Sequence, residues 1–234
     1  MNYRTLLILI VILILIFIFY FVYKNKKHGY FLLNQRFYDY KKICPELEIL
    51  RDNRDIIIKD IENVNNSSWD DWPEKNLYTE DMTWKILPFY GFDMWITHNC
   101  NLCPNIVKVI KKIPNLRTAL LSKISPDTKL SPHKGWGNLS NNILRSHYGI
   151  SVPDKCYLYV ENEKKRIKDN EIIIFDDSKL HYAENFGDAE RTILIIDIKR
   201  PDFVKKGNSN VTDTKELTGL INSLKMMNEM KLNN

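Results

Sequence analysis

The chain has 234 residues, of which 44% are hydrophobic, 12% aromatic and 27% charged, a composition typical of a folded globular protein and not of a disordered one. The length is that of a single domain of ordinary size. The formal net charge of +5 is modest, and its local excess follows an N-terminal apolar segment instead of forming a long basic stripe, so nucleic acid is not an expected partner.

The N-terminal segment is uninterruptedly apolar from Leu6 to Val22. With the flanking Tyr23 it just reaches the length that a helix needs to cross the bilayer core. A cleaved signal peptide has a shorter apolar region that ends in small residues, whereas this segment runs directly into Lys24. We therefore predict a single-pass membrane protein that is held in the lipid bilayer by residues 6–23.

Two features of the sequence point to opposite sides of the membrane for the large domain. The basic residues that flank the span are Arg4 before it and Lys24, Lys26 and Lys27 after it. The positive-inside rule then places the domain in the cytosol. Asn-x-Ser/Thr sequons, which matter only in a lumenal domain, begin at Asn65, Asn66, Asn138 and Asn210. The sequence leaves the side open.

Residues 28–103 mix aromatic and charged side chains without a sustained period, and include Trp69, Trp72 and Trp84. Such a Trp-rich stretch commonly packs over a core or lines a cleft.

The four cysteines are Cys44, Cys100, Cys103 and Cys156. Cys100, Cys103 and the nearby His98 suggest a zinc site or a redox pair, but a structural zinc site needs about four ligands and no second Cys/His cluster is present. Free thiols are the expected state.

Apolar residues at helical spacing, with proline suited to the first turn, predict a short helix from Pro104 to Lys112. Short β-like runs separated by turn residues follow at Ala119–Ile124, Ile143–Val152, Cys156–Val160, Glu171–Phe175 and Arg191–Ile198. Several short strands at this spacing predict a sandwich or barrel. The charged segment Glu161–Asn170 is interpreted as a solvated hairpin connection. From Asp213 onward, an amphipathic helix is expected to present one apolar face, made of Leu217, Leu220, Ile221, Leu224 and Met227.

Two histidines, His133 and His181, each follow a predicted strand. A lone histidine at such a place is more often a surface residue than a ligand, but two imidazoles from opposed strands of a small barrel can share one metal. Arg145 and His147 lie two apart in one strand and so share a face. Arg191 begins an apolar strand, where a cation is costly unless it meets an anion.

These residues lie in ordered blocks that resemble the aspartyl/asparaginyl β-hydroxylase family over roughly Cys103 to Asp202. The blocks are Ser122-Lys-Ile-Ser-Pro-Asp-Thr128, Pro132-His-Lys-Gly135, Leu144-Arg-Ser-His-Tyr-Gly149, Phe175-Asp-Asp-Ser-Lys-Leu-His181, and Arg191-Thr-Ile-Leu-Ile-Ile-Asp197 followed by Pro201. The segment between His133 and Arg145 is slightly longer than in the family.

The resemblance implies a mainly β double-stranded β-helix, the jelly-roll or cupin-like core of 2-oxoglutarate oxygenases, with flanking helices. It implies that His133 and His181 bind Fe(II), that Arg191, helped by Ser122, binds the distal carboxylate of 2-oxoglutarate, and that Arg145 and His147 contact the other carboxylate. Four parts are then expected: a membrane anchor and basic flank at 1–27, the N-terminal part of the catalytic region at 28–103, the oxygenase core at 104–202 and a C-terminal amphipathic helix at 203–234.

Most non-haem iron oxygenases add a carboxylate two residues after the first histidine, and that position here is Gly135. The family is similar in leaving this coordination position to water. Asp176 and Asp177 are candidates for a substitute ligand, but we expect them to form the turn that presents His181.

The resemblance implies a dioxygenase that hydroxylates an unactivated carbon, in either a protein Asp/Asn side chain or a lipid acyl chain. Two other classes stay open. One is an inactive jelly-roll binding module tethered to a membrane. The other is a zinc-dependent hydrolase that uses the same histidines, although it gives Arg191 no role.

Overall fold

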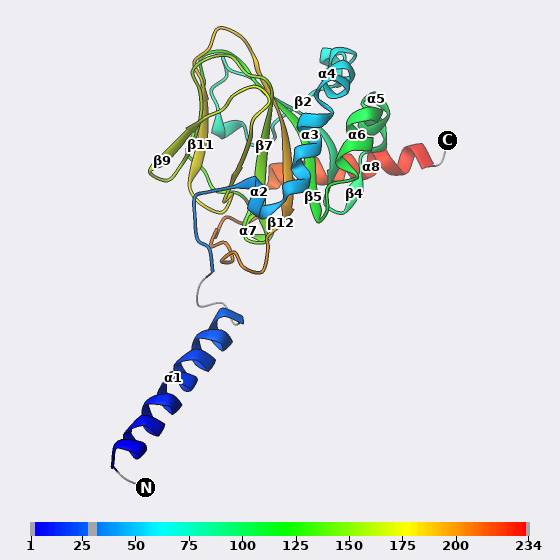
Figure 1. The fold of residues 1–234 in the computed structure, drawn as a ribbon. Helices are drawn as coiled ribbons and strands as arrows, with labels where there is room; N and C mark the ends of the chain where they lie inside the picture. The colour runs from blue at the N-terminus through cyan, green and yellow to red at the C-terminus, as the bar shows by residue number, and fades with distance from the viewer. Residues whose placement is uncertain (1–2, 28–31, 233–234) are drawn as a thin grey trace. The chain divides into compact units, whose positions relative to one another are not determined.

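The computed structural model describes residues 3–27 and 32–232 (Figure 1). They fall into two compact units, one of residues 1–34 with 201–205 and the other of residues 35–200 with 206–234. The site residues predicted from the sequence all lie in the second unit.

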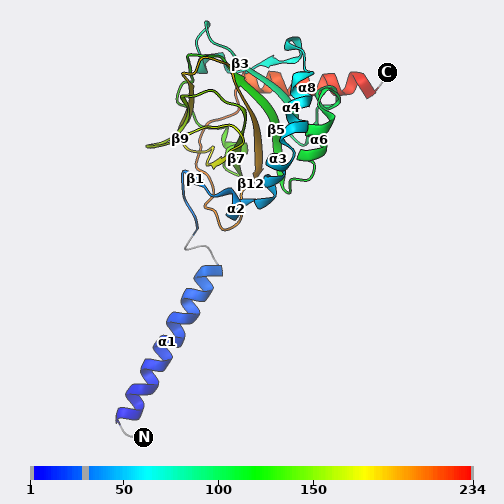
Figure 2. The same ribbon diagram turned by 45° about the horizontal axis from the view of Figure 1, so that its top comes forward.

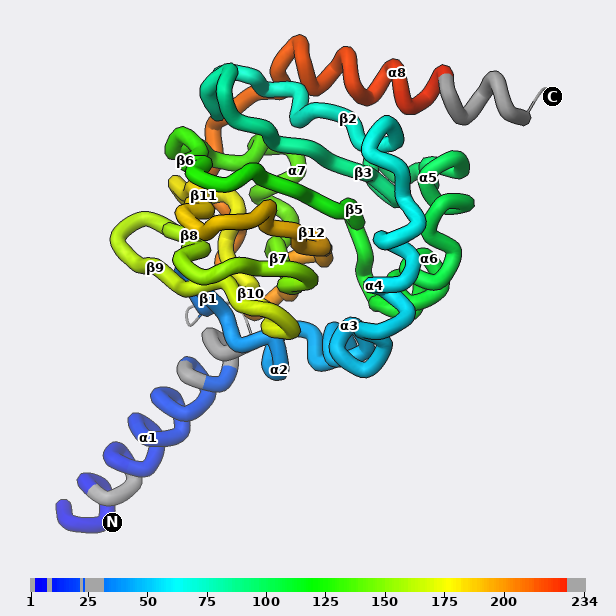
Figure 3. The backbone as a smooth tube through the Cα atoms, turned by 90° about the horizontal axis from the view of Figure 1, so that it is seen from above, coloured from blue at the N-terminus to red at the C-terminus, as the bar shows by residue number. Residues whose placement is uncertain are grey.

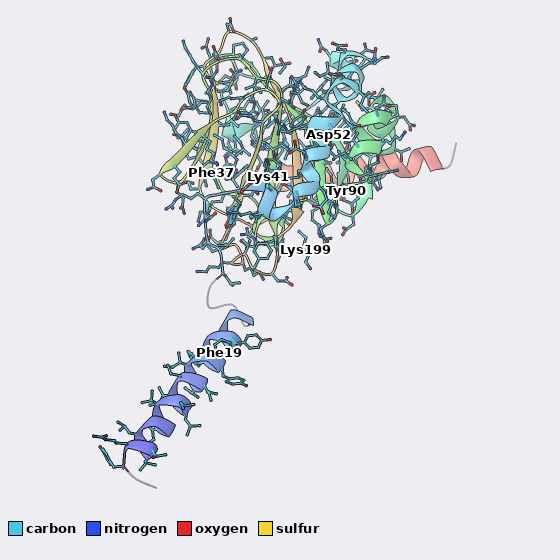
Figure 4. The ribbon with its side chains drawn as sticks, in the orientation of Figure 1. Phe19, Phe37, Lys41, Asp52, Tyr90 and Lys199 are labelled. Carbon is cyan, nitrogen blue, oxygen red and sulfur yellow. The ribbon has the colours of Figure 1, made fainter. Side chains whose placement is uncertain are left out.

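The first unit contains the long helix α1 (Tyr3–Lys27). Its stretch Tyr3–Phe21 has a mean hydropathy of 2.9 and is long and apolar enough to cross a membrane. The side chains of α1 project outward, and Phe19 is 74% exposed (Figure 4). In the same unit, Leu33 forms an isolated parallel bridge with Val204.

The second unit is built on a large and a small antiparallel sheet. The strands of the large sheet are β1 (Phe37–Tyr38), β2 (Asp70–Asp71), β3 (Trp84–Gly91), β4 (Met94–Trp95), β5 (Leu116–Ile124), β7 (Ile143–Ser151), β10 (Ile172–Phe175) and β12 (Arg191–Lys199). They are ordered β1-β10-β7-β12-β5-β3-β2, and β4 pairs with β3. Figure 2 shows β3, β5, β12 and β7 following one another across this sheet.

The small sheet has the order β6-β11-β8-β9. Its strands are β6 (Thr128–Lys129), β8 (Cys156–Val160), β9 (Glu163–Arg166) and β11 (His181–Asn185). Buried side chains of both sheets, such as Leu158 on β8 and Ile193 on β12, belong to one hydrophobic cluster. This two-sheet arrangement is the expected double-stranded β-helix, or jelly roll, with flanking helices.

α-Helices flank the sheets. They are α2 (Tyr40–Ile43), α3 (Glu48–Asp52), α4 (Arg54–Glu62), α5 (Thr97–Leu102), α6 (Pro104–Ile110), α7 (Gly137–Ser140) and α8 (Lys215–Leu232). Figure 3 shows α4, α5 and α6 grouped on one side of the strands, with α8 running past the end that carries β2 and β3. Buried Asp60 joins α4 to α6, because its carboxylate accepts hydrogen bonds from the Asn105 side chain and the Ile106 amide.

Most elements expected from the sequence are present. The predicted helix at Pro104 corresponds to α6, and the five predicted strands correspond to β5, β7, β8, β10 and β12. The amphipathic C-terminal helix is α8, which buries Leu217 and Leu224 and packs Leu220 and Ile221 against the core. The side chain of Met227 lies outside the described residues. The finer boundaries at 103/104 and 202/203 stay predictions.

The interpretation of Glu161–Asn170 as a connection was wrong, because the segment contains the strand β9. This strand pairs with β8 from Tyr157↔Arg166 to Val160↔Glu163. Its four residues are all exposed at the sheet edge, where charged side chains discourage pairing with other chains. An edge strand of this kind has no apolar alternation by which it could be recognised. Figure 4 shows Phe37 of β1 close to this edge, and Lys165 lies 4.9 Å from the centre of its ring.

Candidate active site

The site residues predicted from the sequence come together in a cavity between the two sheets. Its lining includes all six of them: Ser122, His133, Arg145, His147, Arg191 and His181. The remaining lining residues are Trp84, Leu130, Leu158, Phe175, Ala183 and Ile195. The site is therefore a polar cluster enclosed by apolar walls, as small-molecule sites commonly are.

His133 and His181 face each other across an antiparallel backbone bridge. The His133 amide donates to the His181 carbonyl at 2.9 Å, and the His181 amide donates to the His133 carbonyl at 2.8 Å. The ring centroids are 4.4 Å apart. The backbone thus holds the two imidazoles close enough to contact one small ligand between them.

In each histidine, Nδ1 is engaged by the backbone and Nε2 is not. His133 Nδ1 lies 2.7 Å from the Ser131 carbonyl, and His181 Nδ1 lies 2.9 Å from the Lys179 carbonyl. A ring nitrogen can bond to a carbonyl only as a donor, so each Nδ1 carries the proton and each Nε2 keeps its lone pair. This is the tautomer and the outer hydrogen bond that metal-ligating histidines usually have.

Both imidazoles are neutral at physiological pH. Burial lowers the pKa of His133 to about 3, with a further contribution from the adjacent His181. Burial likewise lowers the pKa of His181 to about 4. The lone pairs are therefore available to a metal ion without a preceding loss of protons.

The lowered histidine pKa values predict that the metal-free protein loses stability in mild acid. Unfolding returns both pKa values to about 6.5, so between about pH 6.5 and 4 the unfolded state binds more protons than the folded state. The contribution of His133 and His181 to the free energy of unfolding is complete above about pH 6.5. As the pH falls toward 4, this contribution decreases by up to about 1.4 kcal/mol per pH unit for each imidazole. Thermal unfolding from pH 7 to 4.5 measures this slope. The double variant His133→Gln/His181→Gln should flatten it, whereas His98→Gln on α5 should leave it unchanged.

Arg191 carries a buried charge that no carboxylate of the described residues balances. It is 2% exposed, and its Nε and Nη1 have no hydrogen-bond partner among the described residues. Burial lowers its pKa to about 10, so the guanidinium stays charged at neutral pH. Such a charge is costly unless an anion meets it, and the position is therefore suited to a carboxylate or another small anion.

Two neighbours of Arg191 in the cavity lining have unused hydrogen-bonding capacity. Trp84 Nε1 donates to Ser122 Oγ at 3.1 Å, which leaves the hydroxyl proton of Ser122 free to donate to another acceptor. His147 Nδ1 is buried without a partner among the described residues. Burial, together with Arg191, lowers the pKa of His147 well below its usual value.

Arg145 differs from Arg191 because it is held by two carboxylates. Its Nε and Nη2 donate to Asp197 at 2.7 and 2.9 Å, and its Nη1 lies 2.7 Å from Asp177 Oδ1. Burial alone would lower the pKa of Arg145, but the two carboxylates raise it above its usual value. In the structure Arg145 is thus part of an ionic network that reaches the histidines, since Asp177 Oδ1 lies 3.5 Å from His181 Nε2.

The two consecutive aspartates before His181 have different roles. Asp176 forms the expected turn: its carboxylate accepts from the amide and hydroxyl of Ser178 and is bound by Arg200. Arg200 and Ser178 outweigh burial and lower the pKa of Asp176. Asp177 points instead toward Arg145, and sequence reasoning did not anticipate this direction.

Gly135 is required where a third iron ligand usually stands. A Cβ atom at Gly135 would lie 1.9 Å from Asp177 Oδ2 and 2.8 Å from Ser140 Cβ. The Gly135 amide donates to the Asp177 carbonyl at 2.9 Å. The carboxylate of Asp177 thus fills the space beside the glycine.

Gly135→Ala is expected to destabilise the protein by about 1–3 kcal/mol, because the methyl group overlaps a buried carboxylate that Arg145 holds in place. Chemical denaturation measures the change. Gly219→Ala on α8 is the control, since no atom lies within 4 Å of its added Cβ, and it should not destabilise the protein.

In the part of the chain that the structure describes, no group of three or more His, Cys, Asp or Glu side chains is arranged to hold a metal ion. A metal bound by His133 and His181 would therefore have two protein ligands. Cys100 and Cys103 are free thiols, as are Cys44 and Cys156.

Sequence reasoning missed Asp197 as a member of the site. Asp197 lies directly opposite Arg145 in the β12–β7 register, and on the same face of β12 as Arg191 because they are six residues apart. A carboxylate in an otherwise apolar strand, on the face that carries an arginine, was the signal that could have revealed it.

Comparisons with known proteins agree on one family. A family model described as aspartyl/asparaginyl β-hydroxylase matches residues 51–201. The ornithine lipid ester-linked acyl 2-hydroxylase of Rhizobium tropici is 32% identical over 168 residues, which make up 70% of this chain and 55% of that protein.

Two animal proteins are similar over shorter stretches. The mouse aspartate β-hydroxylase domain-containing protein 2 is 29% identical over 131 residues, 51% of this chain and 36% of that protein. The human aspartyl/asparaginyl β-hydroxylase is 28% identical over 137 residues, 56% of this chain and 18% of that protein. The chain thus spans about half or less of these relatives. With the family model covering most of the double-stranded β-helix and every residue of the cavity, the chain belongs to the aspartyl/asparaginyl β-hydroxylase family.

Proposed function

We propose that the chain is a membrane-anchored, Fe(II)- and 2-oxoglutarate-dependent dioxygenase that hydroxylates an unactivated carbon. The observation that carries this proposal is that Arg191 Nε and Nη1 have no partner among the described residues, in the same cavity as two imidazoles. The imidazole protons lie on Nδ1, so each Nε2 keeps a lone pair. A divalent metal and a dicarboxylate co-substrate would satisfy both. When bound, iron and 2-oxoglutarate supply the oxidising chemistry that activates dioxygen and removes hydrogen from carbon.

The residues of the chain divide the remaining tasks. His133 and His181 would hold the iron through Nε2, with their rings oriented by the Ser131 and Lys179 carbonyls. Arg191 and the hydroxyl of Ser122 would bind the distal carboxylate of the co-substrate. Iron held by only two protein ligands depends for much of its binding on chelation by the co-substrate.

Arg145 and His147 would face the carboxylate of 2-oxoglutarate that lies nearer the metal. The Asp177 and Asp197 carboxylates hold the Arg145 guanidinium in place. The apolar walls of the cavity, among them Leu158 and Phe175, exclude water and so limit side reactions.

Lipid and protein substrates are the two candidates. The relative from Rhizobium tropici is named for hydroxylation of a lipid acyl chain, and helix α1 would hold the enzyme at the bilayer where such chains are found. The human relative is named for hydroxylation of aspartyl and asparaginyl residues. We favour the acyl chain because the lipid-modifying relative matches more of this chain.

Succinate release from 2-oxoglutarate tests the reaction class. The full-length protein in lipid nanodiscs, loaded anaerobically with Fe(II) and then exposed to oxygen, is expected to form succinate, whereas His133→Ala and Arg191→Ala are not. His98→Ala, altered at an exposed position on α5, should match the parent.

Two further results separate the alternatives. Vesicles containing an aminoacyl lipid should stimulate succinate formation and gain one oxygen atom on an acyl chain, whereas stimulation by Asp- or Asn-containing peptides alone would favour the protein substrate. Absence of succinate, together with Fe(II) binding that is independent of 2-oxoglutarate, would contradict the oxygenase and favour the binding module. Tighter binding of Zn(II) without the keto acid would favour the hydrolase.

A further inference from the structure

Three tryptophan side chains form one continuous stack that starts at the cavity. Trp72 lies between the other two: its ring is 4.3 Å from that of Trp84 with an interplanar angle of 8°, and 5.6 Å from that of Trp136 with an angle of 7°. All three rings are buried. Both ring pairs are therefore stacked and nearly parallel.

The inner end of the stack meets the candidate iron site. Trp84 lines the cavity, its ring centroid is 6.2 Å from that of His133, and its Nε1 donates to Ser122. Any oxidant formed at the two histidines would therefore have an indole ring as a close neighbour.

The outer end of the stack has a proton acceptor. Trp136 Nε1 donates to Glu74 Oε1 at 3.2 Å, and Glu74 is partly exposed to solvent. Trp72, in the middle, has a buried Nε1 without a hydrogen-bond partner among the described residues. Of the three indoles, Trp136 is thus the one with a carboxylate in position to remove its proton.

This arrangement fits electron transfer. An indole is among the side chains most easily oxidised by one electron, and neighbouring π faces stabilise the resulting positive charge. Loss of the Nε1 proton to a carboxylate then traps the oxidation at that ring. Stacked rings whose centroids are 4.3 and 5.6 Å apart are close enough for the charge to move from the first indole to the third.

We propose that Trp84, Trp72 and Trp136 conduct oxidising equivalents away from the metal site when the enzyme activates dioxygen without a substrate in place. The proposal rests on the proposed oxygenase function. It gives the three indoles a protective task, because oxidant that is not removed attacks the cavity itself.

The proposed transfer moves one electron at a time along the stack. One electron passes from Trp84 to the oxidised metal site, Trp72 reduces Trp84, and Trp136 reduces Trp72. Trp136 then loses its Nε1 proton to Glu74, so a neutral indolyl radical and a protonated carboxyl group result. A one-electron reductant of the ascorbate or thiol class returns the electron, and Glu74 returns the proton. Two such transfers, together with two protons from solvent, reduce one oxygen atom of dioxygen to water. This is the oxygen atom that was not used in decarboxylation.

The decisive variant is Trp72→Phe, which interrupts the stack without altering a residue of the cavity. The full-length protein is loaded with Fe(II) and 2-oxoglutarate and exposed to oxygen without substrate. The parent is expected to show a tryptophanyl radical by electron paramagnetic resonance after rapid freezing, and a mass gain of one oxygen atom at Trp136. Trp72→Phe should lose this radical, become oxidised at Trp84 or His133, and inactivate several-fold sooner.

Trp69→Phe is the matched control, because Trp69 is also buried but lies outside the three-ring stack. It should behave as the parent. Glu74→Gln keeps the stack but removes the proton acceptor, so it should change the radical from the neutral to the cationic form. This second variant also covers the possibility that Trp72→Phe does not fold.

Two outcomes overturn the proposal in distinguishable ways. If the parent forms succinate but the oxidised positions and inactivation rates are the same in the parent, Trp72→Phe and Glu74→Gln, the stack is only structural and the oxygenase function stands. If the parent forms no succinate, the oxidant is missing and both proposals fail.

Discussion

Replacing Arg191 by methionine is expected to stabilise the ligand-free protein by about 1–4 kcal/mol, because the change removes a buried charge that no anion balances and keeps most of the side-chain volume. The same change should abolish 2-oxoglutarate-dependent iron binding and succinate formation. Substitution of a residue that is preorganised for binding is expected to raise stability and to abolish function.

Chemical denaturation of the metal-free protein measures the first effect, and iron binding with and without 2-oxoglutarate measures the second. Arg191→Lys is the matched variant: it keeps the charge but not the two-pronged geometry, so it should weaken co-substrate binding without the gain in stability. Destabilisation of the protein by Arg191→Met would contradict the view that Arg191 lacks an internal partner.

Replacing Arg145 by methionine is expected to change stability in the opposite direction, that is, to destabilise the protein. Arg145→Met leaves the buried carboxylates of Asp177 and Asp197 without the cation that both contact, and removal of one member of a buried ionic group typically costs about 3–5 kcal/mol. The protein should therefore unfold at markedly lower denaturant concentration.

A double-mutant series identifies the cause of this loss. Adding Asp177→Asn to Arg145→Met should recover part of the stability, because one of the two unpaired charges is then gone. Equal stability of Arg145→Met and the parent would show that the carboxylates take up protons at little cost. The contrast between two buried arginines that line one cavity follows from their partners alone.

The sequence predicts the parts of this fold in which apolar periodicity is strong. Strands such as β8 and β12 have regular apolar residues and were located within one or two residues of their observed ends. The strand β3 was missed because its part of the sequence shows no sustained period; it also contains Pro88, a residue that is uncommon inside strands. The structure accommodates this proline at a register shift between Pro88 and Tyr90 in the pairing with β5.

The candidate site could be predicted as a list of residues but not as a network. The residue blocks around His133, Arg145 and His181 indicate which residues form the site, because their spacing resembles that of a known family. Which carboxylate meets which cation depends on strand register, and the pairing of Asp197 with Arg145 cannot be derived from either strand alone.

The backbone bridge between His133 and His181 has a consequence for iron supply. Because each residue donates to the carbonyl of the other, the spacing of the two imidazoles is set by main-chain hydrogen bonds and not by the metal. If iron binds there as proposed, its release would leave the two imidazoles in place for reloading. If the proposed iron is held by two protein ligands instead of three, the fraction of active molecules should follow the concentration of exchangeable iron. The proposed hydroxylation would then slow in iron-poor cells without loss of protein.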